Sequence, residues 1–463
     1  MTRHYRLAVV AILFVLIPVF TQAASDRAPP NIILIMSDDM GWADLGSYGA
    51  TDLRTPNIDT LARDGVRLTD FYANGVFCSP TRAGLISGRY QQRYGVETPL
   101  PNQSAASSLG LNATGTSLPQ LLKNTGYSTA LVGKWHLGYQ KNQIPNAHGF
   151  DYFFGLLSGY HDYYTHNGGD GKPDLYENDK PVTETGYMTD MITTHAKTWI
   201  KDHAKGPFFI DVAFNAPHWP YQVPDHPSEA PNHARHVMPA DENTGTRADY
   251  VAMVERMDRG VGEILNLLTE LKLDNNTIVV FTNDNGGEWL ANNAPLFNRK
   301  YTTWEGGIRV PALIRWPGHI AAGKVSDQVG ITMDLTASFL AAAGAKVPAE
   351  ARLDGMDLFP IMEGKAPEVA RTLFWRVNNG GHNMKAVRSG DWKLVVNGVH
   401  QFVFNVRTDL AERNDLTRYQ QAKARELLQR YNEWESQINS EAPKLVVRPN
   451  STQNAAGDSR PSD

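Results

Sequence analysis

One short segment, residues 77–89, combines residue types that could act on an anion. It contains Cys78, the only cysteine among the 463 residues, and Arg82 follows four positions later. Its turn-forming and capping residues predict a short helix over 80–87 with Ser79 as the N-cap. Cys78 would then lie beside the unpaired N–H groups at the start of this helix, where an anion is favoured. The alternative is that Cys78 is a small apolar side chain with a packing role only.

Four apolar runs each lead directly into polar residues that could bind an ion or a substrate. The runs at 31–36, 128–132, 208–214 and 277–282 predict strands that are buried on both faces. They are followed by Asp38 and Asp39, by Lys134 and His136, by His218, and by Asp284 and Asn285. Because the carboxyl ends of strands in an open α/β sheet share one crevice, we expect these side chains to meet there.

The acidic and amide side chains of this set predict a metal site. The predicted ligands are Asp38, Asp39, Asp284, Asn285 and an oxygen derived from Cys78. Hard oxygen ligands suit Ca²⁺, with Mg²⁺ as the alternative, and disfavour zinc. Since a thiol is a poor ligand for a hard cation, this ligand set favours conversion of Cys78 to an oxygen species. An Asp-Asp pair by itself would more often be a solvated turn.

The basic side chains predict binding of a tetrahedral oxyanion. The cationic set is Arg82, Lys134, His136, His218 and Lys300. Crowding so many cationic groups around one metal ion is favourable only if an anion enters the site.

The chain resembles the type I sulfatases. The matching segments are Cys78 to Arg82 with Leu85 and Gly88-Arg89, Asp38-Asp39, Gly133 to Gly138, Ala216 to His218, Asp284 to Gly287, Lys300 with Glu305 to Gly307, Ala386 to Arg388, and Asp391 to Leu394. The resemblance covers nearly the whole mature chain. One departure is Arg299, since many members of that family carry glycine before the lysine.

This resemblance implies hydrolysis of sulfate monoesters with Cα-formylglycine, made from Cys78 by a maturation enzyme, as the nucleophile in its hydrated form. Asp284 would help to remove the proton of the attacking hydroxyl group. The sulfate oxygens would be held by Arg82, Lys134 and Lys300. His218 or Lys300 would protonate the departing oxygen, and His136 would deprotonate the second hydroxyl group to release sulfate.

The elements that position these residues predict an α/β fold. We expect a large mixed, mostly parallel sheet sandwiched by helices, as in alkaline-phosphatase-like proteins, and a smaller C-terminal antiparallel sheet with one helix. The predicted boundaries are a signal peptide at 1–23, a catalytic domain at 27–370, a small α+β domain at 371–440 and a disordered tail at 441–463. The signal peptide predicts export to the periplasm or the medium, with an uncleaved anchor as the alternative.

The composition of the chain limits the kinds of molecule that it is expected to bind. A net charge of -5, with 41% hydrophobic and 20% charged residues, predicts neither a nucleic-acid partner nor stable membrane association.

The predicted substrate-binding residues are Tyr160, His161, His166, Arg299 and His382. Aromatic loops often shape a binding mouth, so we expect a sulfated carbohydrate or an aryl sulfate as substrate. A packed surface flap is the alternative for the aromatic loop.

Three other functions fit parts of this pattern. A phosphodiesterase or phosphonate hydrolase of the same superfamily could use similar ligands. A non-catalytic protein that binds sulfated glycans, or a structural metal protein, would need only some of these residues. The sequence leaves open the natural substrate, the ring position of the sulfate, exo or endo action, the metal and the oligomeric state.

Overall fold

The computed structural model describes residues 28–101, 109–226, 245–379 and 382–442. The predicted signal peptide at 1–23 and nearly all of the predicted tail at 441–463 lie outside these residues. Among the described residues, none of the helices has both the length and the apolar character needed to cross a bilayer.

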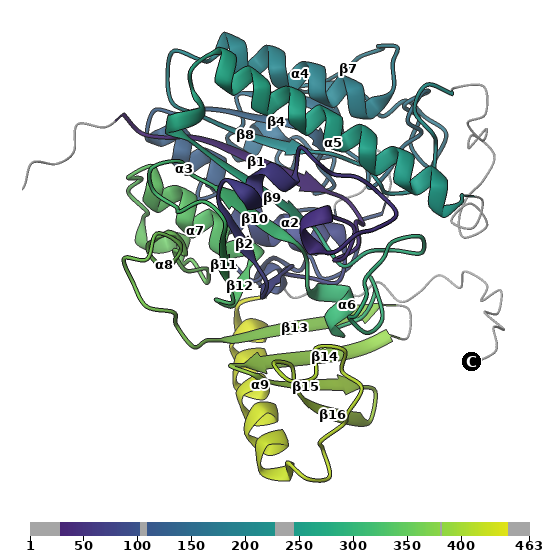
Figure 1. The fold of residues 1–463 in the computed structure, drawn as a ribbon, viewed down its shortest axis with the longest axis vertical. Coiled ribbons are helices and arrows are strands. Elements are labelled where there is room, and N and C mark those ends of the chain that lie inside the picture. The colour runs from purple at the N-terminus through teal and green to yellow at the C-terminus, as the bar shows by residue number, and fades with distance from the viewer. Residues whose placement is uncertain (1–27, 102–108, 227–244, 380–381, 443–463) are drawn as a thin grey trace, which may run out of the picture.

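A ten-stranded sheet forms the centre of the larger part of the molecule (Figure 1). Its middle strand β1 (Asn31–Ser37) pairs in parallel with β8 (Phe208–Ala213) on one side and β9 (Thr277–Asn283) on the other. Next to β8, β4 (Ser128–Lys134) and β5 (Tyr152–Leu156) continue the parallel arrangement. The prediction of a mostly parallel sheet is therefore confirmed.

The outer strands of this sheet are shorter and mostly antiparallel. Beyond β9, the sheet continues through β10 (Ala312–Arg315), β2 (Val66–Leu68) and β11 (Lys324–Ser326), and β10 is antiparallel to both of its neighbours. Beyond β5, it ends in β6 (Tyr176–Glu177) and β7 (Lys180–Pro181). A separate small sheet pairs β3 (Phe71–Tyr72) with β12 (Gly330–Ile331).

Helices cover both faces of the large sheet. On one face lie α4 (Met188–Asp202) and α5 (Arg247–Glu270), which also pack against each other. On the other face lie α2 (Cys78–Ser87), α3 (Leu118–Asn124) and α7 (Thr332–Ala342). The shorter helices are α1 (Asp59–Arg63), α6 (Glu305–Ile308) and α8 (Phe359–Met362), with 3-10 turns at Gly46–Tyr48, Gln91–Tyr94, Pro145–His148, Asp274–Asn276 and Ala349–Ala351.

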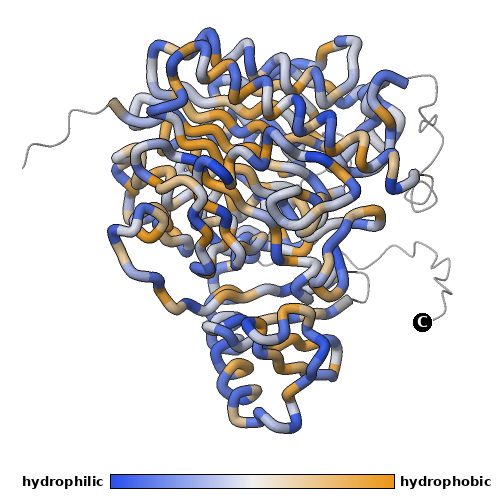
Figure 2. The backbone as a smooth tube through the Cα atoms, viewed as in Figure 1, coloured by the Kyte–Doolittle hydropathy of each residue, from blue (hydrophilic) through white to orange (hydrophobic). Residues whose placement is uncertain are grey.

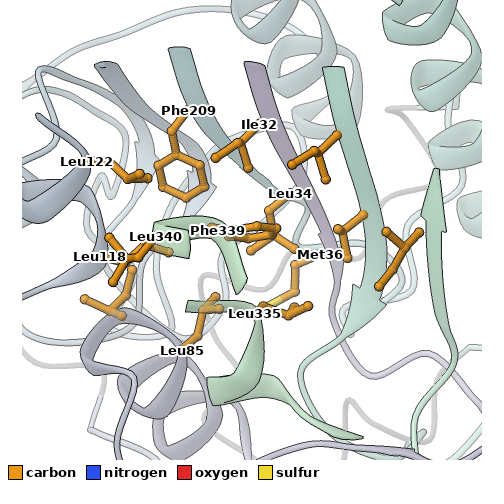
Figure 3. Close-up of a cluster of buried hydrophobic side chains, with 14 of the residues drawn as sticks. Ile32, Leu34, Met36, Leu85, Leu118, Leu122, Phe209, Leu335, Phe339 and Leu340 are labelled. Carbon is orange, nitrogen blue, oxygen red and sulfur yellow. The ribbon is translucent and has the colours of Figure 1, made fainter. Parts of the chain in front are cut away.

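Burial on both faces explains why the strands are continuous apolar runs. Ile32, Leu34 and Met36 of β1 point into the cluster formed with α2 and α7 (Figure 3), and the alternate residues point into the cluster beneath α4 and α5. All seven residues of β1 and of β9 are buried. Figure 2 shows the resulting band of apolar chain through the middle of the larger part.

The C-terminal part is an antiparallel sheet with one helix, as predicted. The sheet contains β13 (Thr372–Asn379), β14 (His382–Ser389), β15 (Trp392–Asn397) and β16 (His400–Asn405), in that order. The helix α9 (Gln421–Glu441) packs on this sheet. The proposed boundary at 370/371 remains a prediction.

The helix that carries the cysteine begins earlier than predicted. Its first residue is Cys78 and its N-cap is Phe77, without a side-chain capping bond. The assignment of Ser79 as N-cap is therefore wrong. The hydroxyl of Ser79 instead accepts a hydrogen bond from the backbone N–H of Leu100 at 3.0 Å, so a tertiary contact replaces the local cap. The predicted C-terminal stop is correct, because Gly88 adopts φ 67° there.

Candidate active site

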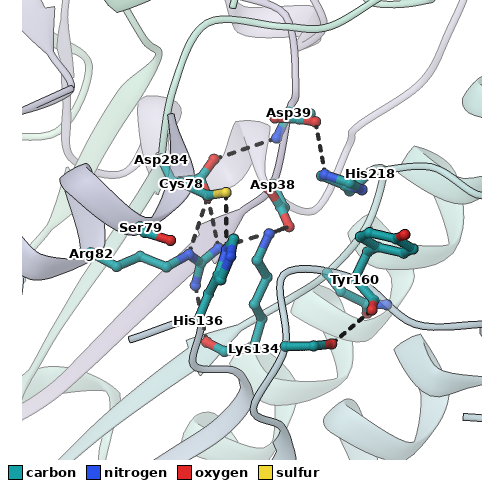
Figure 4. Close-up of polar contacts among 12 residues, drawn as sticks. Asp38, Asp39, Cys78, Ser79, Arg82, Lys134, His136, Tyr160, His218 and Asp284 are labelled. Atoms are coloured by element: carbon teal, nitrogen blue, oxygen red, sulfur yellow. Dashed lines mark hydrogen bonds and ion pairs between the residues drawn. The ribbon is translucent and has the colours of Figure 1, made fainter. Parts of the chain in front are cut away.

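The polar residues that follow four neighbouring strands meet at the start of α2 (Figure 4). Ligating atoms of Asp38, Cys78 and Asp284 lie within 4.8 Å of one another, and so do those of Asp38, Asp39 and His218. The segments that supply these residues span 246 positions of the chain, from Asp38 to Asp284. The convergence expected at the carboxyl ends of the strands is thus present in the structure.

Two of the site residues adopt left-handed backbone conformations. Asp39 has φ 64° and His136 has φ 56°, values that residues other than glycine rarely adopt. Each follows the end of a parallel strand. The side chain of His136 lies against Cys78 at the start of α2, and that of Asp39 points toward His218. Such conformations cost free energy and are found preferentially at functional sites.

One ion-pair network joins Arg82 to two carboxylates. The guanidinium donates twice to Oδ2 of Asp284, at 3.1 and 2.9 Å, and once to the backbone carbonyl of Lys134 at 3.0 Å. The ammonium of Lys134 contacts Asp38 directly. All four side chains are buried. Burial and the nearby Asp284 raise the pKa of Asp38, although Lys134 opposes this change.

A second network is centred on Asp39. Its Oδ2 accepts from Nζ of Lys300 at 2.7 Å and lies 3.3 Å from Nε2 of His218. Burial opposes ionisation of Asp39, but Lys300 and His218 together lower its pKa below the ordinary value. Burial opposes the charge of Lys300 as well, yet Asp39 raises the pKa of that ammonium well above its usual value. Burial lowers the pKa of His218 well below its usual value, although Asp39 opposes this change.

The environment of Cys78 is set by His136. The Sγ atom of Cys78 lies 3.1 Å from Nδ1 of His136, whose Nε2 donates to the carbonyl of Leu100 at 2.9 Å. That bond places the ring proton on Nε2 and leaves the Nδ1 lone pair directed at residue 78. Burial and the charge of Lys134 lower the pKa of His136 well below its usual value, so the ring is neutral at neutral pH.

Two buried oxygens test whether the site fits a cation. Oδ1 of Asp38 and Oδ1 of Asn285 have no hydrogen-bond partner among the described residues. Buried polar atoms without partners are costly in folded proteins. Both atoms belong to the predicted ligand set, whose other members are also oxygen donors apart from the thiol. The donor set therefore fits a hard divalent cation.

The five predicted substrate-binding residues are not all in one place. The Tyr160 ring stacks near His218, with 6.1 Å between ring centroids, so it lies beside the site. His161 and His166 are buried, with 5.6 Å between their ring centroids. Arg299 points outward and lies 4.9 Å above the ring of Trp289. His382 begins β14, and its side chain lies outside the described part.

Sequence reasoning gave no individual role to two buried acids, of which Glu288 lies next to the site. Glu288 lies 3.9 Å from Nζ of Lys300. Glu305 binds Lys393 at 2.7 Å and Arg309 at 3.0 Å, which fixes α6 against the C-terminal sheet. The signal for Glu288 was its position just after the two glycines that follow Asn285. The pairing of Glu305 with Lys393 depends on a contact 88 positions apart, and no local pattern predicts it.

Comparisons with known proteins decide the family. The family model described as Sulfatase matches residues 30–345, and the model described as N-sulphoglucosamine sulphohydrolase, C-terminal, matches residues 294–438. The chain belongs to the sulfatase family. The type I sulfatase resemblance inferred from the sequence is thereby confirmed, and the protein is a sulfatase by its relatives and by its fold.

Three similar proteins show how closely this chain resembles known sulfatases. N-acetylgalactosamine-6-sulfatase of Mus musculus is 36% identical over 411 residues, which span 82% of this chain and 75% of that protein. Arylsulfatase J of Mus musculus is 34% identical over 79% of this chain and 64% of its own length. The crystal structure of Ps i-CgsB in complex with k-i-k-neocarrahexaose superposes with a TM-score of 0.79 and 34% identity, covering 90% of this chain and 94% of that one.

Proposed function

We propose that this sulfatase cleaves sulfate monoesters of a saccharide and that residue 78, oxidised to formylglycine, provides the nucleophile. One observation carries the proposal: side chains from the ends of four strands converge on Cys78 at the first turn of α2. A cation site and a set of cationic side chains around a single residue suit attack on an oxyanion ester.

The proposed cation ligands are Asp38, Asp39, Asp284, Asn285 and residue 78. When bound, a divalent cation supplies Lewis acidity that lowers the pKa of a coordinated hydroxyl group. As a hydrated aldehyde, residue 78 would supply an oxygen nucleophile in place of the thiol. We propose Ca²⁺ as the cation, with Mg²⁺ as the alternative, because the donors are hard oxygens.

The cationic side chains would bind and orient the sulfate group. Arg82 is held rigidly by its two bonds to Asp284 and its bond to the Lys134 carbonyl. Lys134 and Lys300 each contact one carboxylate of the Asp38-Asp39 pair, so their ammonium groups flank the proposed cation site from two sides. Fixed positive charges in a buried site stabilise the negative charge of the transition state without reorganisation.

Proton transfer would involve His136, His218 and Lys300. The unprotonated Nδ1 of His136 faces residue 78 at 3.1 Å, so His136 can accept a proton from a hydroxyl group there. His218 and Lys300 share Oδ2 of Asp39, and either could protonate the departing oxygen of the ester. These roles are assigned from position. His136 faces residue 78, and His218 and Lys300 contact the carboxylate of Asp39.

The saccharide part of the proposal depends on the relatives and on the surface near the site. One relative is named for a sulfated N-acetylgalactosamine, and the structure of Ps i-CgsB contains a neocarrahexaose. Beside the site, Tyr160 offers an aromatic ring next to His218. Aromatic rings next to a catalytic centre suit stacking on sugars. Export of the protein and maturation of Cys78 by a separate enzyme belong to the same proposal.

The test compares turnover of 4-nitrophenyl sulfate with turnover of an aryl phosphate diester, followed by a panel of defined sulfated oligosaccharides. Matured protein should hydrolyse the sulfate ester and at least one saccharide of the panel. Faster turnover of the phosphate diester would favour the phosphodiesterase alternative. A phosphonate monoester hydrolase of Agrobacterium radiobacter shares the fold with a TM-score of 0.62 at 20% identity.

A further inference from the structure

The loop between β9 and α6 has an outer side that the catalytic proposal does not use. Its inner side carries Asn285 and Lys300, and its outer side forms a groove of about 390 Å³. Trp289, Asn298 and Arg299 of the loop line this groove together with Arg413, which comes from the C-terminal part of the chain. The groove is therefore assembled from segments that are more than 100 positions apart.

Trp289 and Arg299 form one wall of the groove. Trp289 is 48% exposed, which is unusual for so large an apolar side chain. The Arg299 guanidinium lies 4.9 Å above the centroid of the indole ring. Stacking on an aromatic ring holds a guanidinium in a fixed plane while its N–H groups stay available to an anion.

Arg413, which also lines the groove, is likewise stacked on an aromatic ring. Its guanidinium lies 5.1 Å above the ring of Phe297, and the residue is exposed. Within the described part of the chain, Arg413 forms no ion pair, and the nearest carboxylate contact of Arg299 is Glu288 at 3.7 Å. Among the described residues that line the groove, Glu288 is the only acidic one, and it is only 3% exposed. The accessible charge of the groove is therefore positive.

The groove is separated from the catalytic lysine by a single side chain. Glu288 lines the groove and lies 3.9 Å from Nζ of Lys300. The backbone N–H of Lys300 also donates to the carbonyl of Gly287 at 3.2 Å, which fixes the loop between the two sites. A substrate whose sulfate ester is held at Lys300 could thus extend into the groove.

We propose that this groove is a subsite for a second anionic sugar of the substrate, with Arg413 and Arg299 binding its sulfate or carboxylate group and Trp289 packing against its ring. The proposal rests on the proposed saccharide sulfatase function and assigns the chemical class of the neighbouring sugar. The subsite therefore selects substrates with two anionic groups, because an aryl sulfate or a monosulfated sugar brings no second anion to Arg299 and Arg413.

Binding calorimetry tests the subsite without interference from turnover. Full-length protein carrying Cys78→Ala is titrated with carboxyl-reduced chondroitin and with carrageenan tetrasaccharides that have one or two sulfate groups, so that sulfate is the only anionic group in each ligand. Adding Arg413→Ala should weaken binding of a disulfated tetrasaccharide about five- to tenfold, as expected for loss of about 1 kcal/mol at a partly exposed site. The same substitution should weaken binding of the monosulfated tetrasaccharide less than about twofold. Trp289→Ala should weaken both, and Trp289→Phe should restore most of the affinity.

Arg425→Ala serves as the matched control, because Arg425 is an exposed arginine of α9 and its loss changes the net charge equally. It should leave every affinity unchanged. Equal affinities with and without Arg413 in both tetrasaccharide series would overturn the subsite. Turnover of 4-nitrophenyl sulfate by matured wild-type protein with Cys78 intact is measured beside these titrations. No turnover of that ester by the matured wild type would contradict the proposed sulfatase function. The calorimetric result with Arg413→Ala tests the subsite alone, so a failure of the subsite can be told from a failure of the proposed function.

Discussion

Adding a divalent cation to metal-free protein should raise its thermal stability, and the structure sets the size of the effect. Oδ1 of Asp38 and Oδ1 of Asn285 are buried without a hydrogen-bond partner among the described residues. An unsatisfied buried polar atom costs about 1–3 kcal/mol, so a cation that ligates both atoms should contribute about 2–6 kcal/mol to the free energy of unfolding. Such a gain corresponds to a cation concentration from roughly 30 to more than 10,000 times Kd.

This free energy converts to a modest change in Tm because the chain is long. An unfolding entropy of about 2.1 cal/mol/K per residue gives about 1 kcal/mol/K for the 463 residues. We therefore expect Ca²⁺ at saturation to raise the Tm by about 2–6 °C. Mg²⁺ should give a smaller rise at equal concentration if Ca²⁺ is the preferred ion.

The assay is differential scanning calorimetry of protein treated with a chelator and then titrated with CaCl₂ or MgCl₂. Asp38→Ala should abolish the cation-dependent rise. Asp258→Asn is the control, since Asp258 is also buried but accepts hydrogen bonds from the backbone of Asn57 at 3.1 Å and of Ile58 at 2.8 Å. It should lower the starting Tm and keep the rise. A rise below about 1 °C in the wild type, or an equal rise in Asp38→Ala, would refute the ligand assignment.

Three further changes test other parts of the structure. Cys78→Ser in a host whose maturation enzyme oxidises cysteine should reduce hydrolysis of 4-nitrophenyl sulfate at least about a hundredfold with an unchanged Tm, since an unmodified serine has a single hydroxyl group and is not an aldehyde hydrate. Near wild-type turnover by protein in which mass analysis finds unmodified serine at position 78 would contradict the role of residue 78. Lys393→Met should lower the free energy of unfolding, measured in urea, by about 3–5 kcal/mol. The reason is that Lys393 lies between Glu305 at 2.7 Å and Glu412 at 2.9 Å, and all three side chains are buried. A loss under about 1 kcal/mol would argue against this network. Burial lowers the pKa of His148 to about 4, so wild-type stability should fall as the pH drops from 7 to 4, because the unfolded state binds the proton first. The stability difference between wild type and His148→Gln should shrink by about 3 kcal/mol over that range in urea titrations, and a constant difference would disagree with a neutral buried ring.

Much of the fold could be predicted because its central strands are buried on both faces. The runs that became β1, β8 and β9 contain few polar residues, which separates them from half-exposed strands, and their short length favours strands over buried helices. The polar residues after each run then predicted a shared site, since parallel strands end at one edge. The order of the strands within the sheet was not available from any of these runs.

Other features depend on contacts that no local pattern encodes. Ser79 looked like an N-cap, but its hydroxyl binds the backbone of Leu100, and the helix starts at Cys78. The left-handed turns at Asp39 and His136 have no glycine to indicate them. The stacking of Arg413 on Phe297 brings together residues 116 positions apart, so the groove beside Lys300 becomes visible only in three dimensions.

The most direct test of the central claim relates the chemical state of residue 78 to catalysis. Protein produced with and without a formylglycine-generating enzyme gives samples that differ in the fraction of residue 78 that is oxidised, which mass analysis of the peptide containing that residue measures. We predict that the kcat for 4-nitrophenyl sulfate rises in proportion to the formylglycine fraction and vanishes when that fraction is zero. Full turnover by protein that contains only cysteine at position 78 would contradict the account.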